Sequence, residues 1–444
     1  MIALRYLVDR NPALCFSEGL KNMKLTMHQV VQNLHLYPHK DSALCATVYA
    51  AALCVDSIFE HIFKDGSFKE YYIEAFQLLQ EISHLQPKDI YLQSLLVSCV
   101  SSLIYSVSSV DQAKFVSTYC LRTVDECKIE CNYRKQEKYD LRRHSFAVLV
   151  KCGRVIGEHM LPLLDDFLSF LSKMYENRDF SSFDIGMFKE MIVTIVNQLN
   201  DSATKKHYLT VLFQRIPDQW NNLPVQSFES FLEFYGISSL TYLSENFIKR
   251  RKDLMEFLQF LKTILQKIEP INGKHPVEKF LVDSVPSLFR LFRGVNQLYA
   301  SSDPSVVPVL GLSKNEKIGL LSEGISHGTN YRNIPVFTSK TEFSIQMEKF
   351  LPQCHSILAD IIGFLGVTLG KQFYYSPGLA QALLQTCVTR FSYLPGYRQK
   401  MIIKNVLAKI IESCPIETYE TITLPLLSEL IDQGNFSLSF IPSW

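Results

Sequence analysis

One serine of this sequence occurs in a pattern that supports nucleophilic catalysis in other folds. Gly324, Ser326 and Gly328 match the G-x-S-x-G nucleophile elbow, in which a sharp strand-to-helix turn exposes the serine beside a separate histidine and acid. Here the motif lies in a polar stretch, and the pattern of the chain predicts no sheet. We therefore predict that Ser326 lies in a loop and takes no part in catalysis.

Two other patterns come close to ligand-binding motifs and depart from them. Residues 366–371 resemble a phosphate-binding loop, but the spacing is one residue short and Gln372 replaces the required Ser or Thr. We interpret these glycines as places where helices pack closely. His35 and His39 are four residues apart, but Pro38 disrupts the helix that would align them as metal ligands.

The eleven cysteines indicate a reducing compartment, because their number is odd and most lie in apolar helical stretches. Cys120, Cys127 and Cys131 could share one side of a helix, but no second pair of ligands lies nearby in sequence. We therefore predict no metal, no cofactor and no enzymatic activity. The chain is expected to bind macromolecules.

Basic clusters are the residues with the clearest potential for binding. Lys249, Arg250, Arg251 and Lys252 form a run of four cations, and a second group, 134–143, ends in Arg142 and Arg143. Such clusters on a helical array would contact the phosphates of a nucleic acid. The alternatives are solvated helix ends or, for the run of four, a nuclear localisation signal. Smaller clusters are Lys205 with Lys206 and His207, and Arg290 with Arg293.

Composition limits the class of protein. Lys and Arg (45) nearly balance Asp and Glu (44), so bulk charge does not indicate a nucleic-acid binder. The amino terminus carries Arg5, Asp9 and Arg10 and has no secretory core. The most apolar run, 357–369, is too short to span a bilayer and contains Asp360. We expect a soluble intracellular protein that does not enter a membrane.

Hydrophobic periodicity predicts helices nearly throughout the chain. In 68–85, Tyr72, Ala75, Leu79 and Ile82 recur at spacings of three and four, which is typical of an amphipathic helix. Proline-containing breaks separate the segments. Each helix needs a partner for its apolar face, and the connectors are short, so antiparallel pairs should stack. The other predicted helices are 90–107, 110–127, 139–159, 161–175, 183–199, 203–216, 252–268, 277–299, 342–369, 378–391, 397–413 and 416–432.

The pair that begins at Leu141 resembles the HEAT repeat consensus. Ala147 is small enough to let two helices approach, and LPLL at 161–164 places a proline in the first turn of the second helix. LPLL returns at 424–427. The predicted fold is therefore an all-α HEAT-repeat α-solenoid, a superhelix of antiparallel helix pairs. It would cover residues 1–444, with a long loop or insertion at 301–341 that is rich in Ser, Gly, Pro and Asn.

The carboxy-terminal quarter resembles the exportin-5 family of the importin-β (karyopherin) superfamily. CPIETYE at 414–420 and PGYR at 395–398 carry the resemblance, with weaker similarity back to about residue 45. The resemblance implies a nuclear export receptor that shuttles between nucleus and cytoplasm. Its partners would be Ran in the GTP form, nuclear pore proteins and double-stranded or hairpin RNA such as microRNA precursors. RNA contacts of this kind address the sugar-phosphate backbone.

The chain departs from that family in length. Family members are more than twice as long, and their amino-terminal repeats that grip Ran have no counterpart here. We therefore expect the isolated chain to bind Ran weakly. Two alternatives stay open: a karyopherin for protein cargo, and an unrelated HEAT-repeat scaffold subunit.

Overall fold

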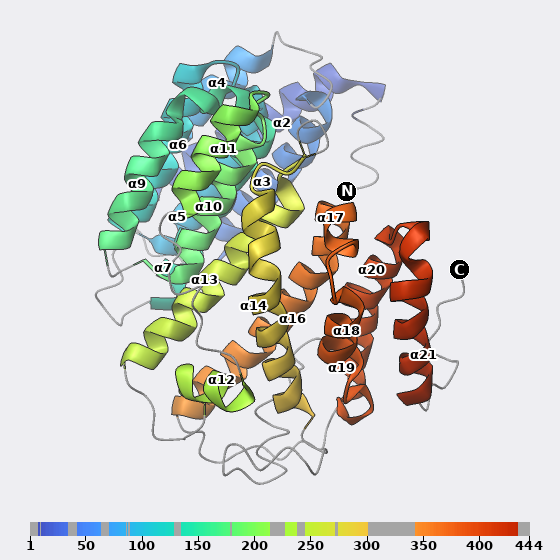
Figure 1. Cartoon of the computed structure of the whole chain (residues 1–444). Helices are drawn as coiled ribbons and strands as arrows, with labels where there is room; N and C mark the ends of the chain where they lie inside the picture. Colours follow the sequence, from blue (N-terminus) through green and yellow to red (C-terminus); the bar gives the residue numbers. More distant parts are fainter. Residues whose placement is uncertain are drawn as a thin grey trace. The chain divides into compact units, whose positions relative to one another are not determined.

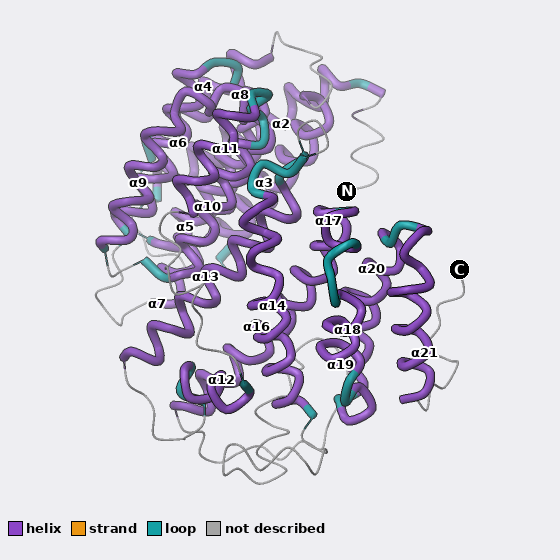
Figure 2. Tube along the Cα trace, in the orientation of Figure 1, coloured by secondary structure: helices purple, strands orange, loops and turns teal. Residues whose placement is uncertain are grey.

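The computed structural model describes residues 8, 10–33, 42–63, 71–85, 87, 89–127, 135–177, 180–213, 227–237, 245–270, 274–300 and 342–433. Helices make up nearly all of this part of the chain, and it contains no β-strand (Figures 1 and 2). Contacts divide the chain into two compact units, Met1–Asn200 and Asp201–Trp444. The predicted all-α class is confirmed. That the two units continue one solenoid stays a prediction.

The first unit consists of helix pairs. Helix α2 pairs with α3, α4 with α5, α6 with α7 and α9 with α10, while the second members α3, α5, α7 and α10 pack side by side in that order. We call these four helices the second-helix row. Stacked pairs of this kind are the architecture that the HEAT resemblance predicts. The bounds are α2 Pro12–Gln32, α3 Ala43–Phe63, α4 Tyr72–Ser83, α5 Ile90–Leu103, α6 Val110–Glu126, α7 Lys135–Val155, α8 Gly157–Met160, α9 Leu164–Glu176 and α10 Ser182–Val196.

Side-chain caps explain where several of these helices begin. The Asp89 carboxylate accepts from the backbone N–H of Leu92 (3.0 Å), and α5 begins at the next residue. The Ser109 hydroxyl caps α6 in the same way. Ser181 and Asp184 form a reciprocal capping box at the start of α10. Each cap satisfies an N–H group that has no partner within the helix, so these boundaries follow from local sequence.

The second unit has helix α16 at its centre. Helices α13 and α14 pack against α16, which also contacts α19, α20 and the turn between them. Helix α14 packs in addition against the turn that follows α18, and α21 packs against that turn. The bounds are α11 Ser202–Phe213, α12 Phe228–Phe234, α13 Glu245–Lys267, α14 Glu278–Tyr299, α16 Glu342–Leu369, α17 Lys371–Tyr374, α18 Leu379–Leu383, α19 Gly396–Ile402, α20 Ala408–Ser413 and α21 Leu424–Gln433.

Three π-helical turns interrupt the last helices of this unit. They span Leu384–Val388, Ile403–Leu407 and Tyr419–Thr423. The sequence pattern predicts three unbroken helices at 378–391, 397–413 and 416–432, and the structure corrects this with a π-turn in each. A π-turn shifts the backbone hydrogen bonds and is frequent at functional sites.

Glycines in α16 allow a close helix crossing. A Cβ atom at Gly363 would overlap the carbonyl oxygen of Asn405, and one at Gly366 would overlap the Tyr374 hydroxyl. The Tyr374 hydroxyl in turn donates to the carbonyl of Ile410 (2.7 Å). Gly366 is therefore a packing position, as predicted, whereas Gly370 has a φ of 50° and a Cβ atom there would meet nothing within 4 Å.

Two helices are long and apolar enough to cross a membrane by length and composition, Ala43–Glu60 and Phe350–Leu369. Both have helical neighbours on more than one side, since α3 contacts α2 and α5 while α16 contacts α13, α14 and α20. Asp360 within the second forms an ion pair with Lys262 (2.6 Å). Of the two, Phe350–Leu369 is 67% buried inside its unit and Ala43–Glu60 is 39% buried.

Some elements differ from the sequence predictions. Helices α2, α3 and α12 were not predicted, and α13 begins at Glu245 rather than at 252. The predicted loop 301–341, with Ser326, lies outside the described residues, as do His35, His39 and Cys131.

Candidate partner-binding surface

The run of four cations lies within α13, where the helix divides it into two pairs. Lys249 and Lys252 are exposed, whereas Arg250 is half-buried and Arg251 is only 4% exposed. A helix rotates about 100° per residue, so four consecutive side chains cannot share one face. Lys249 and Lys252 therefore stay candidates for phosphate contact.

The two arginines cap the end of α12. Arg250 donates to the carbonyl of Phe234 (3.2 Å), and Arg251 donates to the carbonyl of Tyr235 (2.7 Å). These carbonyls follow the last turn of α12 and need donors from outside that helix. The prediction of a phosphate contact was wrong for Arg251, because its guanidinium is buried against its own fold. Burial also lowers the pKa of Arg251.

Arg142 is buried between three helices of the first unit. Its side chain is 2% exposed and lies 3.7 Å from the carboxylate of Asp184 at the start of α10. It also donates to the carbonyl of Cys127 (2.7 Å), which ends α6, and its guanidinium stacks over the Phe180 ring. The predicted phosphate contact was wrong for Arg142 for the same reason. Its neighbour Arg143 is exposed on α7 and stays a candidate.

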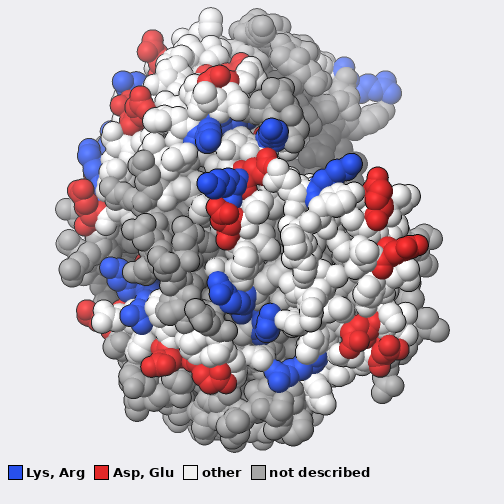
Figure 3. Space-filling view, in the orientation of Figure 1, with Lys and Arg blue, Asp and Glu red and all other residues white. Residues whose placement is uncertain are grey.

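One of the smaller basic clusters divides in the same way, whereas Arg290 and Arg293 are both half-buried. Lys205 is buried and Lys206 exposed, and burial lowers the pKa of Lys205 while Glu269 opposes that shift. Arg290 donates to the Ser287 hydroxyl (3.2 Å). The face shown in Figure 3 carries lysine and arginine side chains interspersed with aspartate and glutamate. On this face, the described lysine and arginine side chains do not form one continuous patch.

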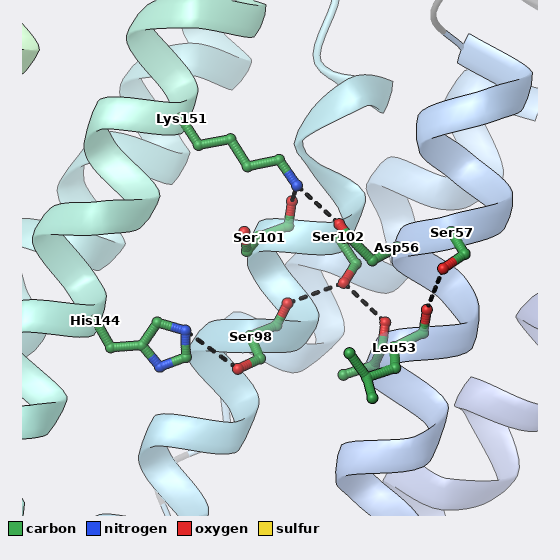
Figure 4. Close-up of polar contacts among 9 residues, drawn as sticks. Leu53, Asp56, Ser57, Ser98, Ser101, Ser102, His144 and Lys151 are labelled. Atoms are coloured by element: carbon green, nitrogen blue, oxygen red, sulfur yellow. Dashed lines mark hydrogen bonds and ion pairs between the residues drawn. The ribbon is translucent and has the colours of Figure 1, made fainter. Parts of the chain in front are cut away.

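A polar seam, which the sequence analysis missed, crosses the second-helix row. Lys151 of α7 donates to the Asp56 carboxylate of α3 (2.8 Å) and to the carbonyl of Ser101 in α5 (3.0 Å), so one ammonium group bridges three helices (Figure 4). The Ser102 hydroxyl donates to the carbonyl of Ala52 in α3 (3.1 Å). This seam fixes the register of neighbouring pairs by satisfying partly buried polar groups.

His144 lies beside the seam and contacts two serines of α5. Its Nδ1 is 3.0 Å from the Ser94 hydroxyl and its Nε2 is 3.2 Å from the Ser98 hydroxyl. Burial, with a smaller contribution from Arg143, lowers the pKa of His144, so the ring is neutral near pH 7. Both ring nitrogens are thus occupied by hydroxyls, which leaves neither for the carboxylate that orients a catalytic histidine. In the sequence, only the spacing of four residues between Ser94 and Ser98 indicates that both hydroxyls could contact one side chain.

The second unit has a comparable bridge. The Asp360 carboxylate accepts from Lys262 of α13 (2.6 Å) through Oδ2 and from Asn405 (2.9 Å) through Oδ1. Three neighbouring segments are therefore joined through one side chain of α16. In both units, the lysine and aspartate side chains of these bridges pair with neighbouring helices of the same unit.

The PGYR segment is also a packing position. Arg398 is buried, donates to the Tyr299 hydroxyl (3.0 Å) and stacks over the Tyr299 ring. In the part of the chain that the structure describes, Arg398 thus serves contacts between helices.

Burial raises the pKa of the Cys120 thiol well above its usual value. The described residues contain no group of three His, Cys, Asp or Glu side chains that could hold a metal ion.

Comparison with known proteins gives a consistent family. A model of the Exportin-5 family matches residues 25–441. Exportin-5 of Homo sapiens is 22% identical over 435 residues, which cover 88% of this chain and 35% of the human protein. Exportin-5 of Dictyostelium discoideum is 20% identical over 384 residues, covering 79% of this chain and 33% of that protein. The chain spans about a third of the length of these relatives.

Proposed function

Because this chain belongs to the Exportin-5 family, we propose that it acts in nuclear export as part of a receptor for structured RNA, such as microRNA precursors, together with GTP-bound Ran. The family match over residues 25–441 carries this proposal. Stacked helix pairs support it, since such arrays present extended surfaces to large partners. The protein would shuttle between nucleus and cytoplasm and would contact nuclear pore proteins on the way.

The RNA contacts proposed here come from exposed cations on two helices. Lys249 and Lys252 project from α13, and Arg143 projects from α7. Separated cations suit a duplex stem, because its phosphates are spaced along two strands and carry no direct sequence information. Affinity for a hairpin should therefore depend on salt and vary little with stem sequence.

Replacing both Lys249 and Lys252 with alanine is expected to weaken hairpin binding and to flatten its salt dependence. Each lost phosphate contact lowers the slope of log K against log salt by roughly one unit, so a loss of about two units is expected. The measurement is a salt titration of hairpin binding, with an unstructured RNA of equal length as comparison. Lys114→Ala together with Lys400→Ala removes two exposed cations elsewhere and serves as the control.

Unchanged slopes in the Lys249 and Lys252 variant would remove this pair as an RNA contact. Equal affinity for the hairpin and the unstructured RNA would instead favour the alternative of a karyopherin for protein cargo. No binding to either RNA and no response to Ran would favour an unrelated HEAT-repeat scaffold.

The isolated chain is expected to bind GTP-loaded Ran weakly. It spans 35% of the human relative, and binding that is distributed over separate repeats loses several orders of magnitude when one set is missing. Calorimetric titration with Ran locked in the GTP form, and with GDP-bound Ran as control, measures this. Tight and GTP-selective binding by the isolated chain would contradict the expectation and show that its own repeats suffice.

A further inference from the structure

A small polar cavity in the second unit lies between the carboxy-terminal part of α14 and the segment that follows α18. Its volume is about 200 Å³, smaller than the roughly 300–1,000 Å³ of pockets for drug-sized ligands. Arg293 and Gln297 of α14 face Gln385, Thr386 and the turn beyond them across this space. None of the residues that line it is acidic. The cavity therefore has the size and the charge for a small anion.

Two polar groups at this cavity are buried without a hydrogen-bond partner. Thr386 is 1% exposed, and its hydroxyl makes no hydrogen bond in the described structure. The Nε of Arg293 is likewise buried and unpartnered. Unsatisfied buried donors are costly and rare in folded proteins. Both are hydrogen-bond donors that belong to residues lining the cavity.

The backbone beside Thr386 is unusual in two respects. Thr386 belongs to the π-turn Leu384–Val388. Arg390, which also lines the cavity, has a φ of 65° and is the one non-glycine residue with positive φ in the described chain. A bulky residue in this region is strained, and such strain concentrates at ligand sites. Here it places a second arginine at the cavity.

A buried hydrogen-bond chain holds the wall in position. The Asn296 side chain donates through Nδ2 to the carbonyl of Thr386 (2.8 Å), and its Oδ1 lies 2.5 Å from His355 Nε2. His355 is fully buried and stacks on Phe292 with 5.0 Å between ring centroids. The carbonyl of Thr386 is thus linked through Asn296 of α14 to His355 of α16. This chain holds the backbone at Thr386 in place without a ligand, and a wall held in advance lowers the cost of binding.

We propose that this cavity binds a single phosphate group. The guanidinium groups of Arg293 and Arg390 would hold its oxygens by charge-assisted hydrogen bonds, for which arginine is well suited. The Thr386 hydroxyl and the amide of Gln297 or Gln385 would donate to the remaining oxygens. The inference goes beyond the proposed function, because it rests on the cavity and holds whether the phosphate is free or part of a nucleic-acid backbone.

The test is a titration of the full chain with inorganic phosphate, at ionic strength held constant with sodium chloride and followed by ³¹P NMR. Saturable binding is expected. Arg293→Gln and Arg390→Asn should each weaken it about tenfold or more, since a hydrogen bond to a charged group is lost. Asparagine tolerates positive φ, so Arg390→Asn should keep its thermal unfolding temperature. Lys114→Gln removes an exposed cation in the other unit and should bind phosphate as wild type does.

A second arm distinguishes the sources of phosphate. If an RNA hairpin displaces bound phosphate from the wild-type chain, the site accepts a backbone phosphate. If both bind together, it is a site for free phosphate. Either outcome supports the cavity as a phosphate site, and neither depends on Lys249 or Lys252. Absence of saturable binding, or equal binding by wild type and both arginine variants, would overturn the proposal.

Discussion

Arg142→Ala is expected to lower the stability of the first unit by about 3–5 kcal/mol, the range found when one partner of a buried ion pair is removed. Arg142 and Asp184 are only 2% and 3% exposed. Without the guanidinium, the Asp184 carboxylate stays buried with no counter-charge, and the carbonyl of Cys127 loses its donor. The end of α6, the middle of α7 and the start of α10 would lose a shared contact.

Arg143→Ala is the matched control for this prediction. It removes the same side chain one residue later, from an exposed position on the same helix. Exposed substitutions of this kind usually change stability by less than about 0.5 kcal/mol. Urea unfolding followed by circular dichroism measures both variants. If the two lost stability equally, Arg142 would not be the buried link between the three helices.

Gly363→Ala is expected to destabilise the second unit by about 3 kcal/mol, the upper part of the range for overpacked cores. The added methyl group would overlap the carbonyl oxygen of Asn405, which is backbone and cannot rotate away. Separation of the two helices would also stretch the hydrogen bond from Asn405 to Asp360 (2.9 Å). Alanine otherwise favours a helix over glycine by roughly 1 kcal/mol, so the sign of the change is informative.

Gly396→Ala tests the same substitution where there is room. Gly396 begins α19, and a Cβ atom there would meet nothing within 4 Å. Its unfolding midpoint is expected to stay level or to rise. The close crossing of α16 would be refuted if Gly363→Ala were as stable as Gly396→Ala.

Most of the fold could be predicted because its causes are local. Apolar side chains at spacings of three and four define the face that a helix must bury. Capping residues such as Asp89 and Ser109 define where a helix begins. The predicted helix starts at 90 and 110 agree with those of α5 and α6. Short connections between such helices leave antiparallel pairing as the arrangement that covers their apolar faces.

The candidate site could be predicted only in part. The sequence identifies cations, but a cluster in sequence is not a cluster in space. Lys249 and Lys252 reach the surface. Arg251 points inward and donates to the carbonyl of Tyr235, which has no partner within α12. Periodicity predicts which face of α13 is buried. It does not predict that the end of α12 packs against that face.

The sequence by itself determined that this chain is helical, that its helices pair, and that its composition and motifs resemble one family of transport receptors. Only the tertiary structure decided which polar groups serve the fold and which are left for a partner. Arg142 forms an ion pair with Asp184, which lies 42 positions later in the sequence. Arg293 and Arg390 line the same cavity. The physical reason is range: helix formation depends on neighbours within a few residues, whereas burial, ion pairing and cavity shape depend on groups brought together from distant segments.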